Sequence, residues 1–167
     1  MRKRIQILTR EQIEQKIKRL AWKLYEDNHK QDEILIVGIA PRGSIIANSL
    51  AQHLADISDI NVTLGSLQLE KNNPYNNDVK FDLNVDNFSN NVVVLCDDVL
   101  NSGKTLMYAA KFFLSSPLTK LSTVVLVDRN HNRYPIKSDY VGLSLATTLH
   151  EYINVVLEGD NQGVYLS

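Results

Sequence analysis

The chain has 167 residues, of which 44% are hydrophobic and 22% charged, and its formal net charge is −1. This composition is typical of one globular domain and excludes a disordered chain or a disulfide-stapled scaffold. The near-zero charge also excludes strong long-range attraction to nucleic acid or anionic lipid.

The lone cysteine, Cys96, can form no internal disulfide and no cysteine zinc site, so we expect a core thiol in a cytoplasmic protein. The apolar stretch in MRKRIQIL is too short for a signal peptide or a membrane span, so we expect no membrane partner.

A first helix is predicted near the start of the chain. Thr9 stands three residues before Gln12, which is the spacing of a capping box, and we expect the helix to run to about Asp27. Its apolar residues recur at helical spacing and form one stripe, made of Ile13, Ile17, Leu20, Ala21 and Leu24. Trp22 points away from this stripe, so it is either covered by a loop of the same chain or exposed as a dimer contact.

Continuous apolar runs then alternate with helical patterns. The runs cover residues 34–39, 92–96 and 124–127, and the helical patterns cover 44–54 and 105–114. Continuous rather than alternating apolar runs indicate strands buried on both faces, so the sequence predicts an α/β domain with a mostly parallel central sheet flanked by helices. With no repeat and no linker, we expect a single domain over 1–167.

A long segment rich in asparagine and aspartate, residues 71–91, interrupts this alternation. Irregular segments of this length inside a compact domain are usually functional or mobile. We therefore expect either a mobile cover over an active site or an ordinary surface hairpin, with 79–85 as a short strand pair.

The stretch VVVLCDDVLNSGKT, residues 92–105, carries the clearest chemical signal. We expect the strand to end at Asp97 and Asp98, and ligands of open α/β sheets gather at such carboxyl ends. The loop that follows opens a helix with small, hydroxylated and glycine residues, whose free N–H groups favour an anion. Carboxylates accept hydrogen bonds from ribose hydroxyls while such a loop holds a 5′-phosphate, so the pattern predicts a sugar-phosphate site.

The ending Gly103-Lys104-Thr105 also resembles the P-loop of NTPases. A P-loop requires a glycine five positions before its GK pair, and Asp98 stands there instead. The acidic strand also runs directly into the loop, which leaves no room for two separate elements. We therefore favour the sugar-phosphate site over an NTPase.

These residues resemble the signature of type I phosphoribosyltransferases. Residues 36–47 (IVGIAPRGSIIA) and 125–143 are further similar to the bifunctional pyrimidine-operon attenuators that have uracil phosphoribosyltransferase activity. The resemblance implies the type I phosphoribosyltransferase fold, with a core over about 9–143, a small hood built from the C-terminal segment and a long mobile loop. It implies transfer of ribose 5-phosphate from phosphoribosyl pyrophosphate to a nucleobase, with release of pyrophosphate.

The resemblance also implies roles for individual residues. Asp97 and Asp98 match the catalytic, ribose-binding acids. The 5′-phosphate loop corresponds to Asn101, Ser102, Gly103, Lys104 and Thr105. The pyrophosphate loop corresponds to Ala40, Pro41, Arg42 and Gly43, in which the Ala40–Pro41 bond is a candidate cis peptide. Mg²⁺ is expected to be held through the substrate without a dedicated metal cluster, and the two aspartates are its candidate protein ligands.

The base site and the partners follow the resemblance less closely. Arg129 and Leu149 are the predicted base-binding residues. Leu149 stands where hypoxanthine-type relatives place an aromatic, which argues against a purine, and the resemblance to the attenuators favours uracil. In the long segment, relatives carry an arginine or a Ser-Tyr pair that clamps pyrophosphate. This chain has instead Lys71, Tyr75 and Lys80. The alternative function is an RNA-binding attenuator with little or no transferase activity, using basic residues such as Lys18, Arg19, His131, Arg133 and Lys137. A homodimer or higher homo-oligomer is expected.

Overall fold

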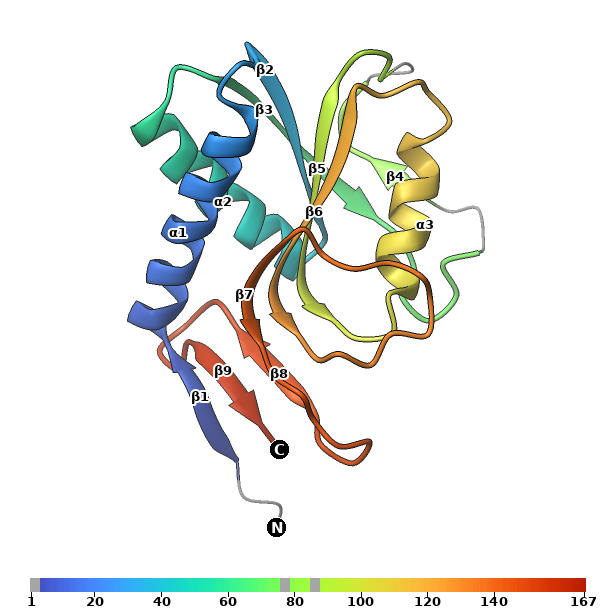
Figure 1. The fold of residues 1–167 in the computed structure, drawn as a ribbon. Helices are drawn as coiled ribbons and strands as arrows, with labels where there is room; N and C mark the ends of the chain where they lie inside the picture. Colours follow the sequence, from blue (N-terminus) through green and yellow to red (C-terminus); the bar gives the residue numbers. More distant parts are fainter. Residues whose placement is uncertain (1–3, 76–78, 85–87) are drawn as a thin grey trace.

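A six-stranded sheet forms the centre of the molecule (Figure 1). The computed structural model describes residues 4–75, 79–84 and 88–167. The strand order is β4-β3-β2-β5-β6-β7, and every neighbouring pair is parallel except β3 and β4. The strands are β2 (Glu33–Ile39), β3 (Asn61–Gln68), β4 (Lys80–Phe81), β5 (Val92–Leu100), β6 (Lys120–Asp128) and β7 (Tyr140–Ser144).

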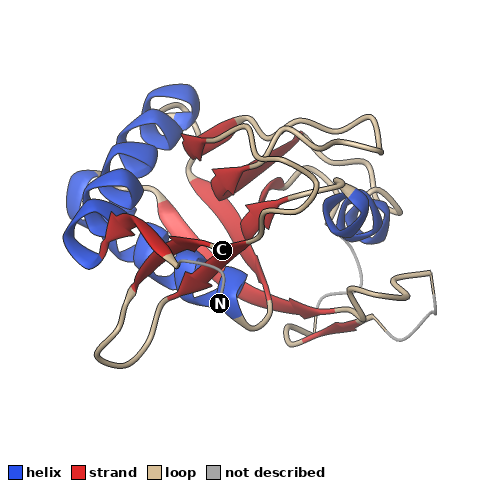
Figure 2. Ribbon diagram, turned by 90° about the horizontal axis from the view of Figure 1, so that it is seen from below, coloured by secondary structure: helices blue, strands red, loops and turns tan. Residues whose placement is uncertain are grey.

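Helices cover both faces of this sheet (Figure 2). Helices α1 (Arg10–Asn28) and α2 (Arg42–Ile57) lie on one face, and α3 (Lys104–Phe113) lies on the other. The predicted capping box opens α1, because Thr9 Oγ1 accepts from the Gln12 N–H at 3.3 Å and Gln12 Oε1 accepts from the Thr9 N–H at 2.9 Å. The predicted α/β class with a mostly parallel sheet is confirmed.

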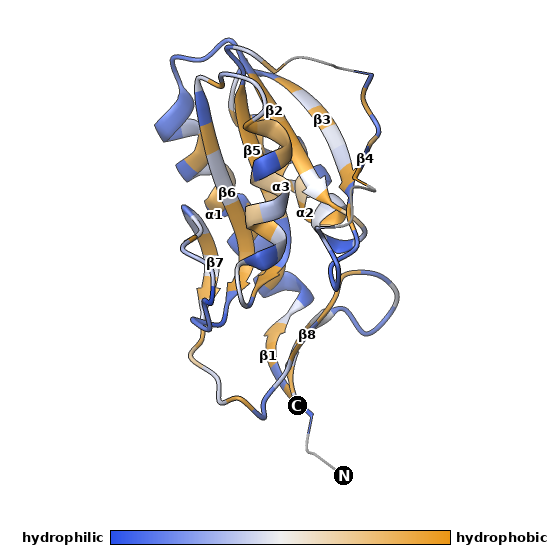
Figure 3. Ribbon diagram, turned by 90° about the vertical axis from the view of Figure 1, so that its right-hand side faces the viewer, coloured by the Kyte–Doolittle hydropathy of each residue, from blue (hydrophilic) through white to orange (hydrophobic). Residues whose placement is uncertain are grey.

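The apolar run of β5 divides the core into two layers. Val94 and Cys96 pack with α1 and α2, whereas Val93 and Leu95 pack with Phe113 of α3. Successive side chains of a strand point to opposite faces, so a run without polar residues is needed when both faces are covered. Figure 3 shows the central strands as the most hydrophobic part of the ribbon.

Both ends of the described chain meet in a second, small sheet. It contains β1 (Ile5–Thr9), β9 (Gly163–Leu166) and β8 (Ile153–Val156), all antiparallel, in the order β1-β9-β8. It lies beside the carboxyl ends of the central strands (Figure 1). We call this sheet, with residues 145–152 that lead into it, the hood. The sequence predicted a hood from the C-terminal segment, which supplies β8 and β9, and β1 of the N-terminal region adds a third strand.

Several element boundaries differ from the sequence prediction. Strand β5 does not end at the acidic pair but continues to Leu100, because its backbone stays paired with β6 through Val127 and Asp128. Strands β3 and β7 and the hood strands were not predicted. Within the expected strand pair 79–85, only Lys80–Phe81 forms a strand, and residues 85–87 lie outside the described part of the chain, as do 76–78 of the long segment.

Trp22 remains 45% exposed, and its ring meets the ring of Tyr25 on the same helix edge-on, with centroids 6.3 Å apart. The described residues therefore cover Trp22 only in part, and the dimer contact stays a prediction. Among the helices described, none is long and apolar enough to span a bilayer.

Candidate active site

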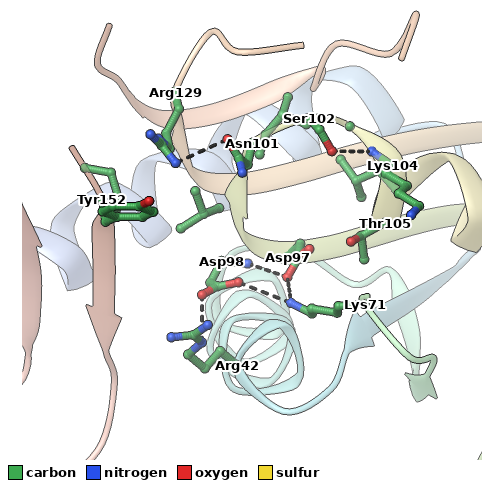
Figure 4. Close-up of a pocket in the computed structure, with 15 residues that line it drawn as sticks. Arg42, Lys71, Asp97, Asp98, Asn101, Ser102, Lys104, Thr105, Arg129 and Tyr152 are labelled. Atoms are coloured by element: carbon green, nitrogen blue, oxygen red, sulfur yellow. Dashed lines mark hydrogen bonds and ion pairs between the residues drawn. The ribbon is translucent and has the colours of Figure 1, made fainter. Parts of the chain in front are cut away.

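A pocket of about 350 Å³ opens where β5 ends and α3 begins (Figure 4). Its floor is the acidic pair, and the loop 101–105 forms one wall. Arg42, Lys71, Arg129 and Tyr152 reach it from four other segments of the chain. The pocket lies at the carboxyl ends of parallel strands, which is where open α/β sheets bind ligands.

Two buried carboxylates face two cations at the floor of the pocket. Asp97 and Asp98 are each only 2% exposed. Lys71 Nζ lies 3.0 Å from Asp97 Oδ1 and 3.6 Å from Asp98 Oδ1, and Arg42 Nε lies 2.7 Å from Asp98 Oδ2. The Asp98 N–H also donates to Asp97 Oδ1 at 2.9 Å. The paired charges explain why two neighbouring aspartates can be buried at the end of an apolar strand.

The environment of Asp97 changes its protonation. The pKa of Asp97 is raised to about 7, mainly by burial and also by the negative charge of Asp98, while the Lys71 ammonium opposes both effects. Asp98 Oδ2 accepts no well-directed hydrogen bond from any residue in the described ranges, so its contact with Arg42 is an ion pair only. This buried oxygen is therefore an acceptor available to a ligand hydroxyl.

The loop 101–105 forms an anion site at the N-terminus of α3. Gly103 precedes the helix with φ of 83°, a left-handed conformation that favours glycine. A Cβ at this position would lie 2.6 Å from Ile136 Cγ2. The Lys104 N–H donates to Ser102 Oγ at 3.3 Å, which turns the loop tightly at the helix start. The arrangement combines backbone N–H groups, hydroxyls and the positive end of a helix dipole.

The predicted pyrophosphate loop lies against the same strand. The Ala40–Pro41 bond is cis, as the sequence suggested. Gly43 packs so closely on β5 that a Cβ there would lie 2.4 Å from the Cys96 carbonyl oxygen. Arg42, the first residue of α2, pairs with Asp98 and donates from Nη1 to the Val155 carbonyl of β8 at 3.3 Å. This glycine contact brings Arg42 beside the acidic pair.

Arg129 joins the phosphate loop to the hood. Its side chain is buried, and its donors reach Asn101 Oδ1 at 3.2 Å, Thr147 Oγ1 at 3.0 Å and the Glu151 carbonyl at 2.6 Å. Since these acceptors occupy Nε and both terminal nitrogens, the guanidinium is well placed to orient the surrounding segments.

The other predicted base-binding residue lies at the edge of the site. Leu149 is 77% exposed and does not line the main pocket, although it borders an adjoining depression together with Arg129 and Tyr152. Tyr152 lines both cavities and was missed by sequence reasoning. Its aromatic ring three residues after Leu149 was the available signal, but only the path of the hood places it at the pocket.

Histidines and Cys96 contribute little to the pocket. His53 pairs with Glu14 at 2.7 Å, and the ring nitrogens of His29 and His131 contact the backbone carbonyls of Glu26 and Thr147. Burial raises the pKa of the Cys96 thiol, which keeps it protonated and apolar in the core. Over residues 4–75, 79–84 and 88–167, no group of three or more acidic, histidine or cysteine side chains could hold a metal.

Comparison with known proteins identifies the family. Residues 4–161 match the model of the phosphoribosyl transferase domain. The chain belongs to the phosphoribosyl transferase family. Among curated relatives, it is 35% identical to the bifunctional protein PyrR of Streptococcus suis, in an alignment that covers 90% of this chain and 88% of that protein. It is 37% identical to the bifunctional protein pyrR of Enterococcus faecalis, with 84% and 82% covered. The predicted family is thus confirmed.

Solved structures support the fold. The chain superposes on the hypoxanthine phosphoribosyltransferase of Trypanosoma cruzi with a TM-score of 0.78 and 17% identity, covering 96% of this chain and 94% of that one. A hypoxanthine-guanine phosphoribosyltransferase of Bacillus anthracis gives a TM-score of 0.73 at 22% identity, covering 89% and 86%. The type I phosphoribosyltransferase fold is therefore confirmed, and the phosphoribosyltransferase function predicted from sequence agrees with the family match and the curated relatives.

Proposed function

We propose that this protein transfers ribose 5-phosphate from phosphoribosyl pyrophosphate to a nucleobase, with uracil favoured, and releases pyrophosphate. The observation that carries the proposal is the continuity of β5 and α3. One strand end supplies two buried carboxylates, and the loop directly after it supplies an anion site at a helix N-terminus. A ribose 5-phosphate needs both features, separated by about one sugar ring.

Each side of the substrate has a matching group. The 5′-phosphate accepts hydrogen bonds from the loop 101–105, and the ribose hydroxyls donate to Asp97 and Asp98. Arg42 lies beside the acids and can offer its guanidinium to the diphosphate. As pyrophosphate leaves, positive charge develops on the ribose ring, and the nearby carboxylates stabilise that charge more than they stabilise the ground state.

Magnesium fits this pocket through the substrate. Asp98 Oδ2 is buried without a directed hydrogen bond, and Asp97 is its neighbour, so the pair offers the oxygen ligands that Mg²⁺ prefers. We propose that these two residues hold Mg²⁺ together with the hydroxyls and diphosphate of the substrate. When bound, the ion neutralises charge on the departing pyrophosphate.

Uracil is the favoured acceptor because of the chain's relatives. Its similarity to proteins named PyrR exceeds 30% identity over most of the chain, whereas the hypoxanthine enzymes share less than 25% and support the fold alone. We propose that the base lies in the part of the pocket lined by Arg129 and Tyr152. Leu149 stays a predicted base contact at the rim of that space.

A panel of nucleobases tests this function. The protein is incubated with phosphoribosyl pyrophosphate, Mg²⁺ and, in turn, uracil, hypoxanthine, guanine, xanthine, adenine or orotate, and pyrophosphate release is measured. We expect release with uracil and its loss when EDTA removes the metal. Absence of a nucleoside monophosphate with every base contradicts the proposal.

RNA binding is the second candidate function, since the relatives are named bifunctional. Lys18 and Arg19 are exposed on α1, and Arg133 and Lys137 are exposed after β6. If the protein is an attenuator with little transferase activity, an Asp97→Asn variant keeps its RNA affinity while any turnover is lost.

A homodimer and a cytoplasmic location remain our predictions. Sedimentation in solution tests the first, and fractionation of cells tests the second.

A further inference from the structure

We propose that Lys71 is a specificity-determining residue that keeps the acidic pair closed to ribose phosphates lacking a diphosphate. Its ammonium occupies the place of the ribose hydroxyls. It is displaced only by a substrate that brings a second anion with which the ammonium can pair. The inference rests on the proposed function, because it assigns to one residue the choice between phosphoribosyl pyrophosphate and simpler ribose 5-phosphates, including the nucleoside monophosphate product.

The first observation is the position of the ammonium. Lys71 Nζ bridges Asp97 Oδ1 at 3.0 Å and Asp98 Oδ1 at 3.6 Å, so it sits on the carboxylate edge that faces the pocket. Figure 4 shows Lys71 and Arg42 both pointing at this pair. A ribose that donates its hydroxyls to this edge of the pair uses the same oxygens, and its binding therefore competes with Lys71.

The second observation is the balance of charge. Asp97 and Asp98 have side chains that are only 3% exposed, and they form ion pairs with two cations, Lys71 and Arg42. Neutral hydroxyls cannot replace a cation next to two buried carboxylates without a large desolvation penalty. A ribose 5-phosphate without diphosphate therefore displaces Lys71 at a net cost.

A substrate that carries a diphosphate changes this balance. Its Mg²⁺ supplies positive charge beside the carboxylates, and its diphosphate supplies a new anionic partner for the displaced ammonium. The Lys71 side chain is 35% exposed, so its head group can exchange partners at the rim of the pocket without unpacking the core. The exchange therefore favours phosphoribosyl pyrophosphate over ribose 5-phosphate.

The third observation is the anchoring of the segment that carries Lys71. Lys104 Nζ donates to the Asn72 carbonyl at 3.2 Å and lies 5.3 Å from the centroid of the Tyr75 ring. These contacts hold the backbone next to Lys71 against the phosphate loop. The four-carbon stem of Lys71 can then move its charge between the two anions while the backbone stays in place.

Calorimetric titration tests the inference without any turnover. Phosphoribosyl pyrophosphate and ribose 5-phosphate are titrated, each with Mg²⁺ and without base, into the wild type and into Lys71→Met and Lys71→Gln. We expect both variants to bind ribose 5-phosphate about tenfold more tightly and phosphoribosyl pyrophosphate about tenfold more weakly. The ratio of the two dissociation constants then falls about a hundredfold.

Two further variants serve as controls. Lys71→Arg keeps the charge and is expected to keep most of the discrimination. Lys111→Met removes an exposed lysine of α3 that does not line the pocket, and it is expected to behave as the wild type. Thermal melts confirm that each variant is folded.

The outcomes separate the inference from the function on which it rests. If loss of the Lys71 charge changes both affinities by the same factor, or changes neither, the inference is overturned while the proposed function stands. If the wild type fails to bind phosphoribosyl pyrophosphate with Mg²⁺, the proposed function is overturned first, and the inference falls with it.

Discussion

The ribose-phosphate side and the base side of the pocket are built in different ways. Asp97, Asp98 and Gly103 belong to a buried strand and the helix start that follows it, and their geometry is fixed by backbone pairing and close packing. On the base side, Leu149 and Tyr152 are exposed residues of the hood. The difference indicates that substitutions on the first side damage both fold and chemistry, whereas substitutions on the second side change which base is accepted.

The largest effect is expected from the acids. Replacing either one, in Asp97→Asn or Asp98→Asn, removes a charge that stabilises the developing positive charge on the ribose. We expect turnover to fall about 10²- to 10³-fold. Steady-state pyrophosphate release measures the loss. Asp56→Asn, which removes an exposed carboxylate of α2, is the matched control, and equal losses in the two kinds of variant contradict the role of the pair.

The rigidity of the phosphate loop predicts the next largest effect. Gly103→Ala adds a Cβ in a left-handed conformation and brings it into contact with Ile136, so we expect the free energy of unfolding to fall by about 2–3 kcal/mol. Gly159 is also left-handed but has nothing within 4 Å of its Cβ position. Gly159→Ala should therefore cost only about 1 kcal/mol. Denaturant titration compares them, and a similar loss for both shows that the contact with Ile136 is unimportant.

The buried acid pair also predicts a dependence on pH. Because the pKa of Asp97 is raised to about 7, mainly by burial, the ionised form predominates only above that pH. We expect kcat/KM for phosphoribosyl pyrophosphate to rise about tenfold from pH 6 to pH 8. A rate that is flat over this range contradicts a requirement for the charged Asp97.

The same shift predicts the pH dependence of stability. Between the ordinary pKa of 3.8 and about 7 the folded protein holds a proton that the unfolded chain has released. The free energy of unfolding should therefore decrease as the pH rises through this range. Melting curves measure the decrease, and Asp97→Asn should not show this contribution.

The smallest effect is expected on the base side. Tyr152→Ala removes an aromatic face from the pocket, so we expect the KM for the base to rise about fivefold with little change in the KM for phosphoribosyl pyrophosphate. Leu149→Ala should change the KM for the base and the KM for phosphoribosyl pyrophosphate less, because the Leu149 side chain is 77% exposed and lies outside the main pocket. A larger effect of Leu149 reverses the two assignments.

The two sides also differ in how far the sequence predicted them. The apolar run 92–96 predicted a buried strand, because burial on both faces requires such a run, and the acidic pair predicted that its end lies at the ligand site. The end of the strand was misplaced, since backbone pairing with β6 continues through polar side chains to Leu100. Strand β3 was missed because its residues are mixed in polarity and many are partly exposed.

Contacts between distant residues were beyond the sequence. Lys71 was recognised as a cation of the long segment, but its pairing with Asp97 joins residues 26 positions apart. Tyr152 reaches the pocket only because β8 pairs with β9, and that pairing carries residues 145–152 along the pocket edge. Neither contact follows from local periodicity or capping, which report only on neighbouring residues.

The bonds of Arg129 have a thermodynamic consequence for the two substrates. One guanidinium is hydrogen-bonded both to Asn101 on the phosphate side and to Thr147 and the Glu151 carbonyl on the hood. A ligand that shifts one set of acceptors changes the energy of the other set, so the two binding equilibria are linked. Linkage is reciprocal: whatever factor the sugar phosphate applies to the affinity for the base, the base applies to the affinity for the sugar phosphate.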